Sequence, residues 1–123
     1  MAIIPVPERP THDLGATRFT SLATPTRGSC ETSVWIVDID PGAPGLPHAM
    51  TREEVFVVLE GTASVALAGA RGRAEPGDAF VVPPDQLFHV VNDGPGRLRM
   101  LCCLPVGGQA RTEGAPFTPP WAQ

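Results

Sequence analysis

Short apolar runs alternate with proline- and glycine-rich breaks along the whole chain. The runs are rich in Val, Ile, Thr, Phe and Trp, which is typical of β-strands, and none has the length and 3.6-residue period of an amphipathic helix. The pattern predicts about eight short strands, spaced about 8 to 12 residues apart, and no helix. We expect these strands at residues 16–22, 32–40, 48–50, 54–59, 63–67, 79–82, 87–91 and 98–104.

The breaks between the runs predict turns at residues 25–29, 69–72 and 92–96 and a long loop at 41–47. Many short strands without helices indicate a sandwich or a barrel, and a closed barrel leaves fewer exposed strand edges. The expected fold is therefore all-β, a single-domain jelly-roll barrel. Its parts are an extended arm at residues 1–15, a barrel core at 20–104 and an irregular proline-rich tail at 105–123.

Composition and charge narrow the classes of function. The chain has 123 residues, enough for one domain, and a net charge of -4, which disfavours nucleic-acid binding because phosphates need a basic face. Its first ten residues lack the features of a signal peptide, and no apolar run reaches the roughly 18 residues of a membrane span. Three cysteines, two of them adjacent, do not suit a disulfide framework. We expect a reduced cytoplasmic protein with no nucleic-acid or membrane partner.

The stretch from residue 42 to 61, GAPGLPHAMTREEVFVVLEG, brings an imidazole, a thioether and a carboxylate together within a few residues. Side chains alternate along a strand, so His48 and Met50 are expected on one face, and Glu54 is expected to join that face from the next strand. Burial would raise the pKa of Glu54, whereas a charged imidazole beside it would lower that pKa. The stretch is therefore a candidate acid-base or metal site.

The spacing of this stretch, G-x5-H-x-M-x3-E-x6-G, resembles the first motif of the cupin superfamily, in which a second histidine stands at the position of Met50. A second cupin motif, G-x5-P-x-G-x2-H-x3-N, is similar to the segment from Gly77 to Asn92. There Phe88 replaces the usual histidine, and His89 follows one residue late. The resemblance implies a small cupin barrel, commonly a homodimer, with an interior site for a small organic ligand.

The resemblance bears on metal binding because cupins usually hold a metal with four ligands from these motifs. Here His48 and Glu54 remain, while Met50 is a soft thioether and Phe88 has no donor atom. No cofactor is certain; the sequence leaves open a weakly bound divalent transition metal on His48 and Glu54, with Met50 and His89 as doubtful further ligands. A one-residue shift turns His89 to the opposite face of its strand unless a bulge intervenes.

Three functions remain open at this stage. In the first, a metal-free pocket lined by Met50, Phe56 and Phe88 binds or transforms a small metabolite, with Glu54 as general acid or base and His48 as its partner, as in an isomerase, cyclase or lyase. The second is a dioxygenase- or isomerase-like metalloenzyme using the same pair and a non-standard ligand. The third is a non-catalytic binding or sensory module.

Two plainer interpretations stand beside these functions. His48 and Glu54 would form a hydrogen bond that only satisfies two buried polar groups. The aromatic residues of the tail, Phe117 and Trp121, are expected to dock as a lid over the barrel mouth or on a neighbouring subunit, or else on the wall of their own barrel.

Overall fold

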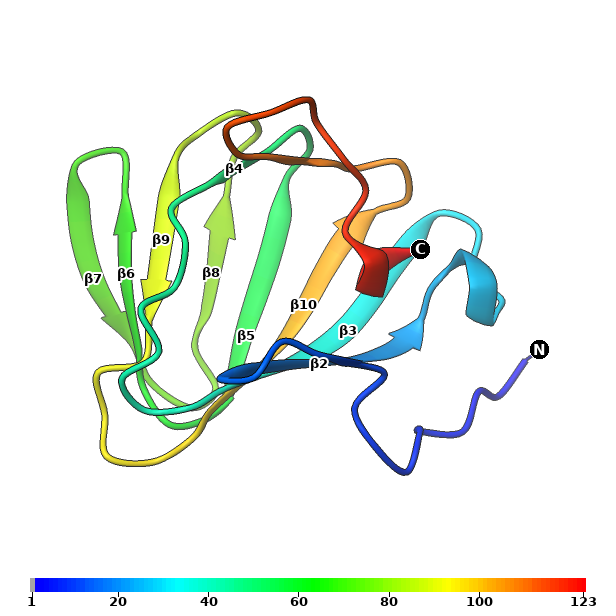
Figure 1. Ribbon diagram of the computed structural model, residues 1–123, viewed down its shortest axis with the longest axis horizontal. Coiled ribbons are helices and arrows are strands. Elements are labelled where there is room, and N and C mark those ends of the chain that lie inside the picture. The colour runs from blue at the N-terminus through cyan, green and yellow to red at the C-terminus, as the bar shows by residue number, and fades with distance from the viewer. Residues whose placement is uncertain (1) are drawn as a thin grey trace.

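The computed structural model describes residues 2–123, and the chain forms a β jelly-roll barrel (Figure 1). Met1, the first residue of the expected arm, lies outside the described residues. The strands are β1 (His12–Asp13), β2 (Thr17–Ala23), β3 (Thr32–Ile39), β4 (Ala49–Met50), β5 (Glu54–Glu60), β6 (Ala63–Leu67), β7 (Ala70–Ala74), β8 (Ala79–Val82), β9 (Phe88–Val91), β10 (Leu98–Pro105) and β11 (Ala110–Arg111), and the two 3-10 turns are η1 (Pro25–Arg27) and η2 (Pro120–Ala122). Over the same residues, no helix is long and apolar enough to cross a membrane.

The strands form three antiparallel sheets. The largest has the order β1-β2-β3-β10-β5-β8, the second has the order β7-β6-β9, and β4 pairs with β11 in a short third sheet. In Figure 1 the three-stranded sheet lies at the left of the six-stranded sheet, and the C-terminal tail crosses over the other end. Strands that are distant in sequence therefore enclose one interior.

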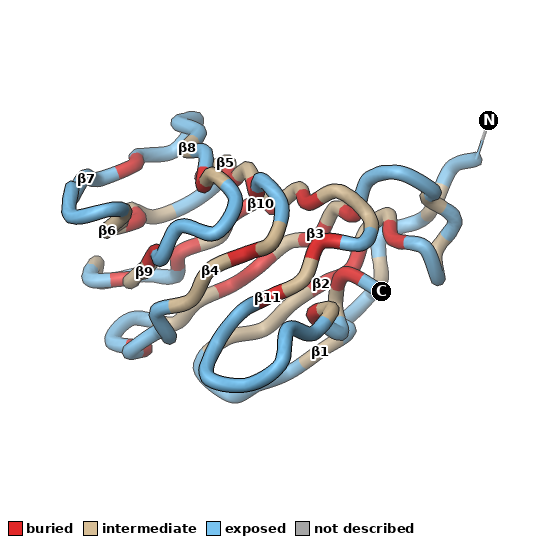
Figure 2. The backbone as a smooth tube through the Cα atoms, turned by 90° about the horizontal axis from the view of Figure 1, so that it is seen from above, coloured by how far each residue is buried: buried red, intermediate tan, exposed pale blue. Residues whose placement is uncertain are grey.

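Strict alternation along the central strands builds the core. In β10 the residues Leu98, Met100, Cys102 and Leu104 are buried, and each intervening residue is partly exposed. Because side chains of a strand alternate between faces, one face of this sheet points into the barrel. Figure 2 shows buried segments along β3, β10 and β5, which are neighbouring strands in the middle of the six-stranded sheet.

Two sequence-based expectations about local structure are wrong. The turn predicted at residues 69–72 lies at Ala68 and Gly69, both at positive φ, and residues 70–74 form β7. This strand has no apolar period, and it forms because its backbone pairs with β6 from Ala63↔Ala74 to Leu67↔Ala70. The tail at 105–123 is also not wholly irregular, since it contains β11 and η2.

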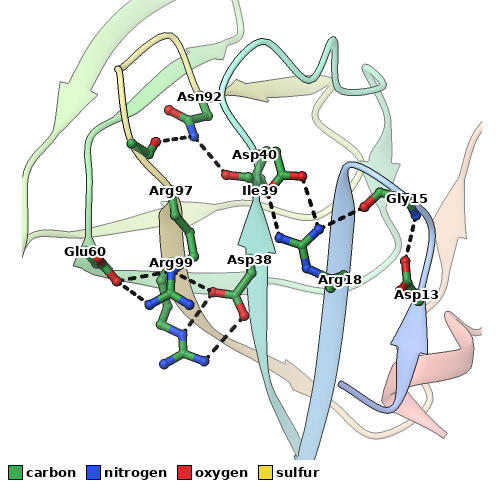
Figure 3. Close-up of polar contacts among 11 residues, drawn as sticks. Asp13, Gly15, Arg18, Asp38, Ile39, Asp40, Glu60, Asn92, Arg97 and Arg99 are labelled. Atoms are coloured by element: carbon green, nitrogen blue, oxygen red, sulfur yellow. Dashed lines mark hydrogen bonds and ion pairs between the residues drawn. The ribbon is translucent and has the colours of Figure 1, made fainter. Parts of the chain in front are cut away.

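A buried carboxylate, Asp38, anchors the outer side of β3 (Figure 3). It is 4% exposed and accepts a hydrogen bond from Arg99 Nε at 2.9 Å, while Arg97 Nε lies 3.6 Å from its Oδ1 atom. Removing the Asp38 carboxylate alone would leave the guanidinium groups of Arg97 and Arg99 without this acceptor. The network therefore ties β3 to β10 at one end of the sheet.

Replacing Asp38 with alanine is expected to lower the free energy of unfolding by about 1–3 kcal/mol, because charge-assisted hydrogen bonds in partly buried sites contribute that much. Urea unfolding followed by tryptophan fluorescence measures the change. The matched control is Asp93→Ala, since Asp93 pairs with Arg73 on the surface and exposed pairs contribute about 0–1 kcal/mol. Equal losses in the two variants would contradict a structural role for Asp38.

Candidate functional site

The barrel interior contains a cavity of about 430 Å³. This volume lies in the range of about 300–1,000 Å³ that is usual for small-molecule sites. The wall is mostly apolar, and its polar side chains come from Thr17, His48, Glu54 and Thr112. Six aromatic residues contribute to the lining: Phe19, Trp35, Phe56, Phe88, Phe117 and Trp121. An apolar, aromatic-rich cavity with few polar groups suits an organic ligand.

Glu54 begins β5 and places its carboxyl group at the wall of this cavity. The residue is 4% exposed, and desolvation by burial raises its pKa to about 8. Among residues 2–123 no hydrogen bond reaches the side chain of Glu54. At pH 7 the carboxyl group therefore keeps its proton and carries a hydrogen-bond donor that has no partner in the protein.

His48 also lines the cavity and lies one residue before β4. Its Nδ1 atom is 2.8 Å from the carbonyl oxygen of Leu46, and its ring centroid is 4.4 Å from that of Phe88. A carbonyl only accepts, so Nδ1 carries the proton in the neutral ring and Nε2 is left as an acceptor. The described part of the chain contains no hydrogen bond between His48 and Glu54, so the expectation of such a pair is wrong. The Nδ1 atom of His48 donates instead to the carbonyl oxygen of Leu46, which is only two residues away along the chain.

The structure brings the other expected pocket residues to the same place. Met50, Phe56 and Phe88 all line the cavity, together with His48 and Glu54. Phe88 packs at 5.8 Å from the ring of Phe56, edge to face. His89 is not part of this wall: its Nε2 atom lies 2.8 Å from the carbonyl oxygen of Pro44. Because Phe88 faces inward, the next side chain of β9 faces outward, and no bulge reverses it.

Cys102 and Trp35 belong to the cavity wall although sequence reasoning did not place them there. They are register partners on neighbouring strands, and Cys102 also lies opposite Phe56 of β5. Burial, and then the nearby Glu54, raise the pKa of the Cys102 thiol well above its ordinary value. The sequence could have indicated this position of Cys102, because the alternation of side chains along β10 puts Cys102 on the same face as Met100.

The C-terminal tail contributes Phe117, Pro119 and Trp121 to the lining of the cavity of its own barrel. Trp121 stacks on Phe19 with ring centroids 3.6 Å apart and an interplanar angle of 4°. Ser21 Oγ donates to the Trp121 carbonyl at 2.7 Å, and Ser33 Oγ donates to the Ala122 carbonyl at 2.8 Å. Phe117 and Trp121 thus form part of the cavity wall within one chain.

The sequence profile of the cupin domain matches residues 35–104, which is more than half of the chain. The chain belongs to the cupin family. No curated protein matches the sequence. The matched segment runs from β3 to β10 and includes both motifs around His48 and Phe88.

Solved structures of other cupins share this fold. KdgF from Halomonas sp. is 27% identical with a TM-score of 0.66, over 83% of this chain and 86% of its own. The polyketide cyclase RemF from Streptomyces resistomycificus is 21% identical with a TM-score of 0.72, over 85% of this chain and 75% of its own. An RmlC-like cupin from Shewanella frigidimarina NCIMB 400 is 24% identical with a TM-score of 0.66, over 76% and 79% of the two chains.

The metal that cupins usually hold does not fit the donor set of this one. Within residues 2–123 no three His, Cys, Asp or Glu side chains lie close enough together to hold an ion. Met50 and Phe88 occupy two of the usual ligand positions, each 2% exposed, and His89 lies outside the cavity. A tight divalent site needs three or four imidazole or carboxylate ligands. The ligand set of His48, Glu54 and His89 is therefore not assembled.

Proposed function

We propose that this cupin binds a small, largely apolar organic metabolite in the barrel cavity and carries out acid-base chemistry on it without a tightly bound metal. The chemistry is of the kind used by isomerases, cyclases and lyases. The observation that carries the proposal is the buried, unpartnered carboxyl group of Glu54 at the wall of an apolar cavity. The carboxyl group faces the cavity with no partner from the protein, so a ligand that offers an acceptor oxygen gains a hydrogen bond there.

Glu54 and His48 are suited to opposite roles in such a reaction. With its pKa raised to about 8, Glu54 still holds a proton at neutral pH and acts as the general acid toward a carbonyl or hydroxyl oxygen. The Nε2 atom of His48 is unprotonated in the neutral ring, because Nδ1 donates to Leu46, and it acts as the general base. Proton removal by His48 with proton donation by Glu54 amounts to enolisation of a ligand carbonyl.

The aromatic wall supports a flat or cyclic ligand. Phe56 and Phe88, whose ring centroids are 5.8 Å apart, line the cavity together with Trp121, which stacks on Phe19. Aromatic side chains offer rigid apolar surface on which rings pack at little entropic cost. The shared fold with a polyketide cyclase, RemF, is compatible with this class of ligand.

A matched pair of probes tests the proposal. 1-Tetralone is an apolar bicyclic ketone, and tetralin has the same skeleton without the carbonyl acceptor. Titration followed by the fluorescence of Trp35 and Trp121 is expected to show roughly fivefold tighter binding of 1-tetralone below pH 8, since one hydrogen bond contributes about 1 kcal/mol. Glu54→Leu is expected to abolish this preference for 1-tetralone. Glu54→Gln keeps a hydrogen-bond donor and is expected to keep part of the preference.

Catalysis is measured separately by deuterium uptake at the carbon next to the carbonyl of 1-tetralone in D₂O. Wild-type protein is expected to accelerate the uptake, and both Glu54→Gln and His48→Gln are expected to remove the acceleration. Binding without acceleration would instead favour the non-catalytic binding module. Equal affinity for the two probes, or no binding of either, would overturn the proposal.

A further inference from the structure

The indole N–H of Trp35 is a second hydrogen-bond donor at the wall of the cavity. Trp35 belongs to β3, lines the cavity and is 2% exposed. Within residues 2–123 its Nε1 atom donates to no protein group, although an indole N–H usually finds a partner when it is buried. Among the described residues, the one side-chain nitrogen or oxygen that is sealed off from open space without a partner is Ser29 Oγ. The Nε1 atom of Trp35 therefore borders open space, and for so deeply buried a side chain that space is the cavity.

The hydroxyl groups that neighbour Trp35 in the sheet are bound to the C-terminal tail. Ser33 lies two residues before Trp35 on the same face of β3, and Ser21 of β2 is the register partner of Trp35. Ser33 Oγ donates to the carbonyl oxygen of Ala122 at 2.8 Å. Ser21 Oγ donates to the carbonyl oxygen of Trp121 at 2.7 Å. The tail is thus held beside Trp35 by these two serines, and the indole N–H remains available to a ligand.

Trp35 differs in kind from most of the aromatic wall. Four of the six aromatic lining residues are phenylalanines, which offer apolar surface and no donor. An indole gives a similarly rigid surface with one N–H at its edge. In a mostly apolar cavity, the few polar groups fix the orientation of a ligand and set the specificity of the site. A ligand with an acceptor oxygen at this point gains a hydrogen bond that a hydrocarbon of the same shape does not.

Trp35 and Glu54 lie on the same inner face of the six-stranded sheet, on strands that are separated by β10 (Figure 2). Cys102 of β10 is the register partner of Trp35 on one side and of Phe56 on the other. Glu54 precedes Phe56 by two residues, so the two side chains share a face. With strands about 4.8 Å apart and about 3.3 Å per residue, the Cα atoms of Trp35 and Glu54 are roughly 12 Å apart. The two donors are therefore placed to bind two different oxygen atoms of one ligand.

We propose that the ligand is a fused-ring ketone with a second oxygen on another ring, and that Trp35 determines this specificity by donating its indole N–H to that oxygen. The inference rests on the proposed function, in which Glu54 donates to the ketone oxygen. A site that is built to hydrogen-bond a polar group of its ligand discriminates strongly against the analogue that lacks this group. Trp35 thus fixes the orientation of the ring system while Glu54 holds the carbonyl group.

Isothermal titration calorimetry tests this specificity with 1-tetralones that carry a hydroxyl group at each position of the aromatic ring in turn. Each is compared with the 1-tetralone that carries a methyl group at the same position, which has a similar size and no acceptor. The preference of the wild type for at least one hydroxyl compound is expected to fall about fivefold in Trp35→Phe and to persist in Glu54→Leu. Binding of the methyl compound by Trp35→Phe shows that the variant is folded. An unchanged preference at every position, or a loss in Trp121→Phe instead, would overturn the proposal.

A proton–nitrogen correlation spectrum observes the indole N–H of Trp35 directly. The chain has two tryptophans, so the spectrum holds two indole signals, and Trp35→Phe assigns them. The preferred hydroxyl compound is expected to shift the Trp35 signal downfield relative to its methyl partner, and equal shifts would overturn the proposal. A preference for the hydroxyl group that depends on Trp35, without any preference for 1-tetralone over tetralin, would overturn only the role of Glu54. The reverse result would overturn only the role of Trp35, and no binding of any probe would overturn both.

Discussion

Glu54→Gln is expected to make the protein more stable than wild type at pH 8 and to leave the two nearly equal near pH 4. The pKa of Glu54 is about 8 in the folded protein, against 4.5 for its ordinary value. Between these values the unfolded chain has released the proton while the folded protein keeps it. The free energy of unfolding of the wild type therefore falls as the pH rises through this window.

The size of the effect follows from the same two pKa values. The slope approaches about 1.4 kcal/mol per pH unit within the window, which sums to about 3–5 kcal/mol by pH 8. Glutamine does not titrate, so the variant lacks this slope. Below pH 4.5 both states of the wild type hold the proton, and above pH 8 both release it, so neither region contributes further.

Urea unfolding of both proteins at half-unit steps from pH 4 to pH 9 measures this difference. Glu53→Gln is the matched control, because Glu53 is the preceding residue and is exposed to solvent. It removes one carboxylate without a burial cost and is expected to follow the wild-type curve. Parallel curves for wild type and Glu54→Gln would show that Glu54 is ionised in the folded cavity. An ionised Glu54 has no proton to donate, so this result would contradict its role as general acid.

The double substitution Met50→His and Phe88→His is expected to create a stoichiometric metal site in the cavity. Both residues line the cavity, and the ring of Phe88 already lies 4.4 Å from that of His48. Together with His48 and Glu54, two more imidazoles complete a set of four nitrogen and oxygen ligands. We expect the affinity for Zn²⁺ or Co²⁺ to rise by roughly 100-fold or more, and bound metal to offset part of the stability lost at the two core positions.

Elemental analysis of protein purified without a chelator or a histidine tag measures the metal content. Wild type is expected to contain well below one metal per chain, and the double variant close to one. Adding His48→Gln to the double variant is expected to remove the gain. Near-stoichiometric metal in the wild type that falls in Glu54→Gln would instead establish a metalloenzyme with a further ligand and overturn the metal-free proposal.

The chain by itself determined the strands that carry a clear apolar signal. The expected strands 32–40, 63–67 and 79–82 agree with β3, β6 and β8 to within a residue, because β-branched runs bounded by proline and glycine are local features. The family followed from residues at fixed spacing around His48 and Glu54, and the profile match over residues 35–104 confirms it. Both successes rest on information that lies within a few residues.

Only the tertiary structure decided which groups face one another. Strand β7 exists because β6 supplies its backbone partners, and the tail is ordered by Phe19, Ser21 and Ser33, about one hundred residues before it. His48 binds Leu46 instead of Glu54, and that leaves the carboxyl group of Glu54 without a partner in the cavity. Burial and pairing of polar groups depend on neighbours that are distant in the chain, and spacing along a strand does not specify them.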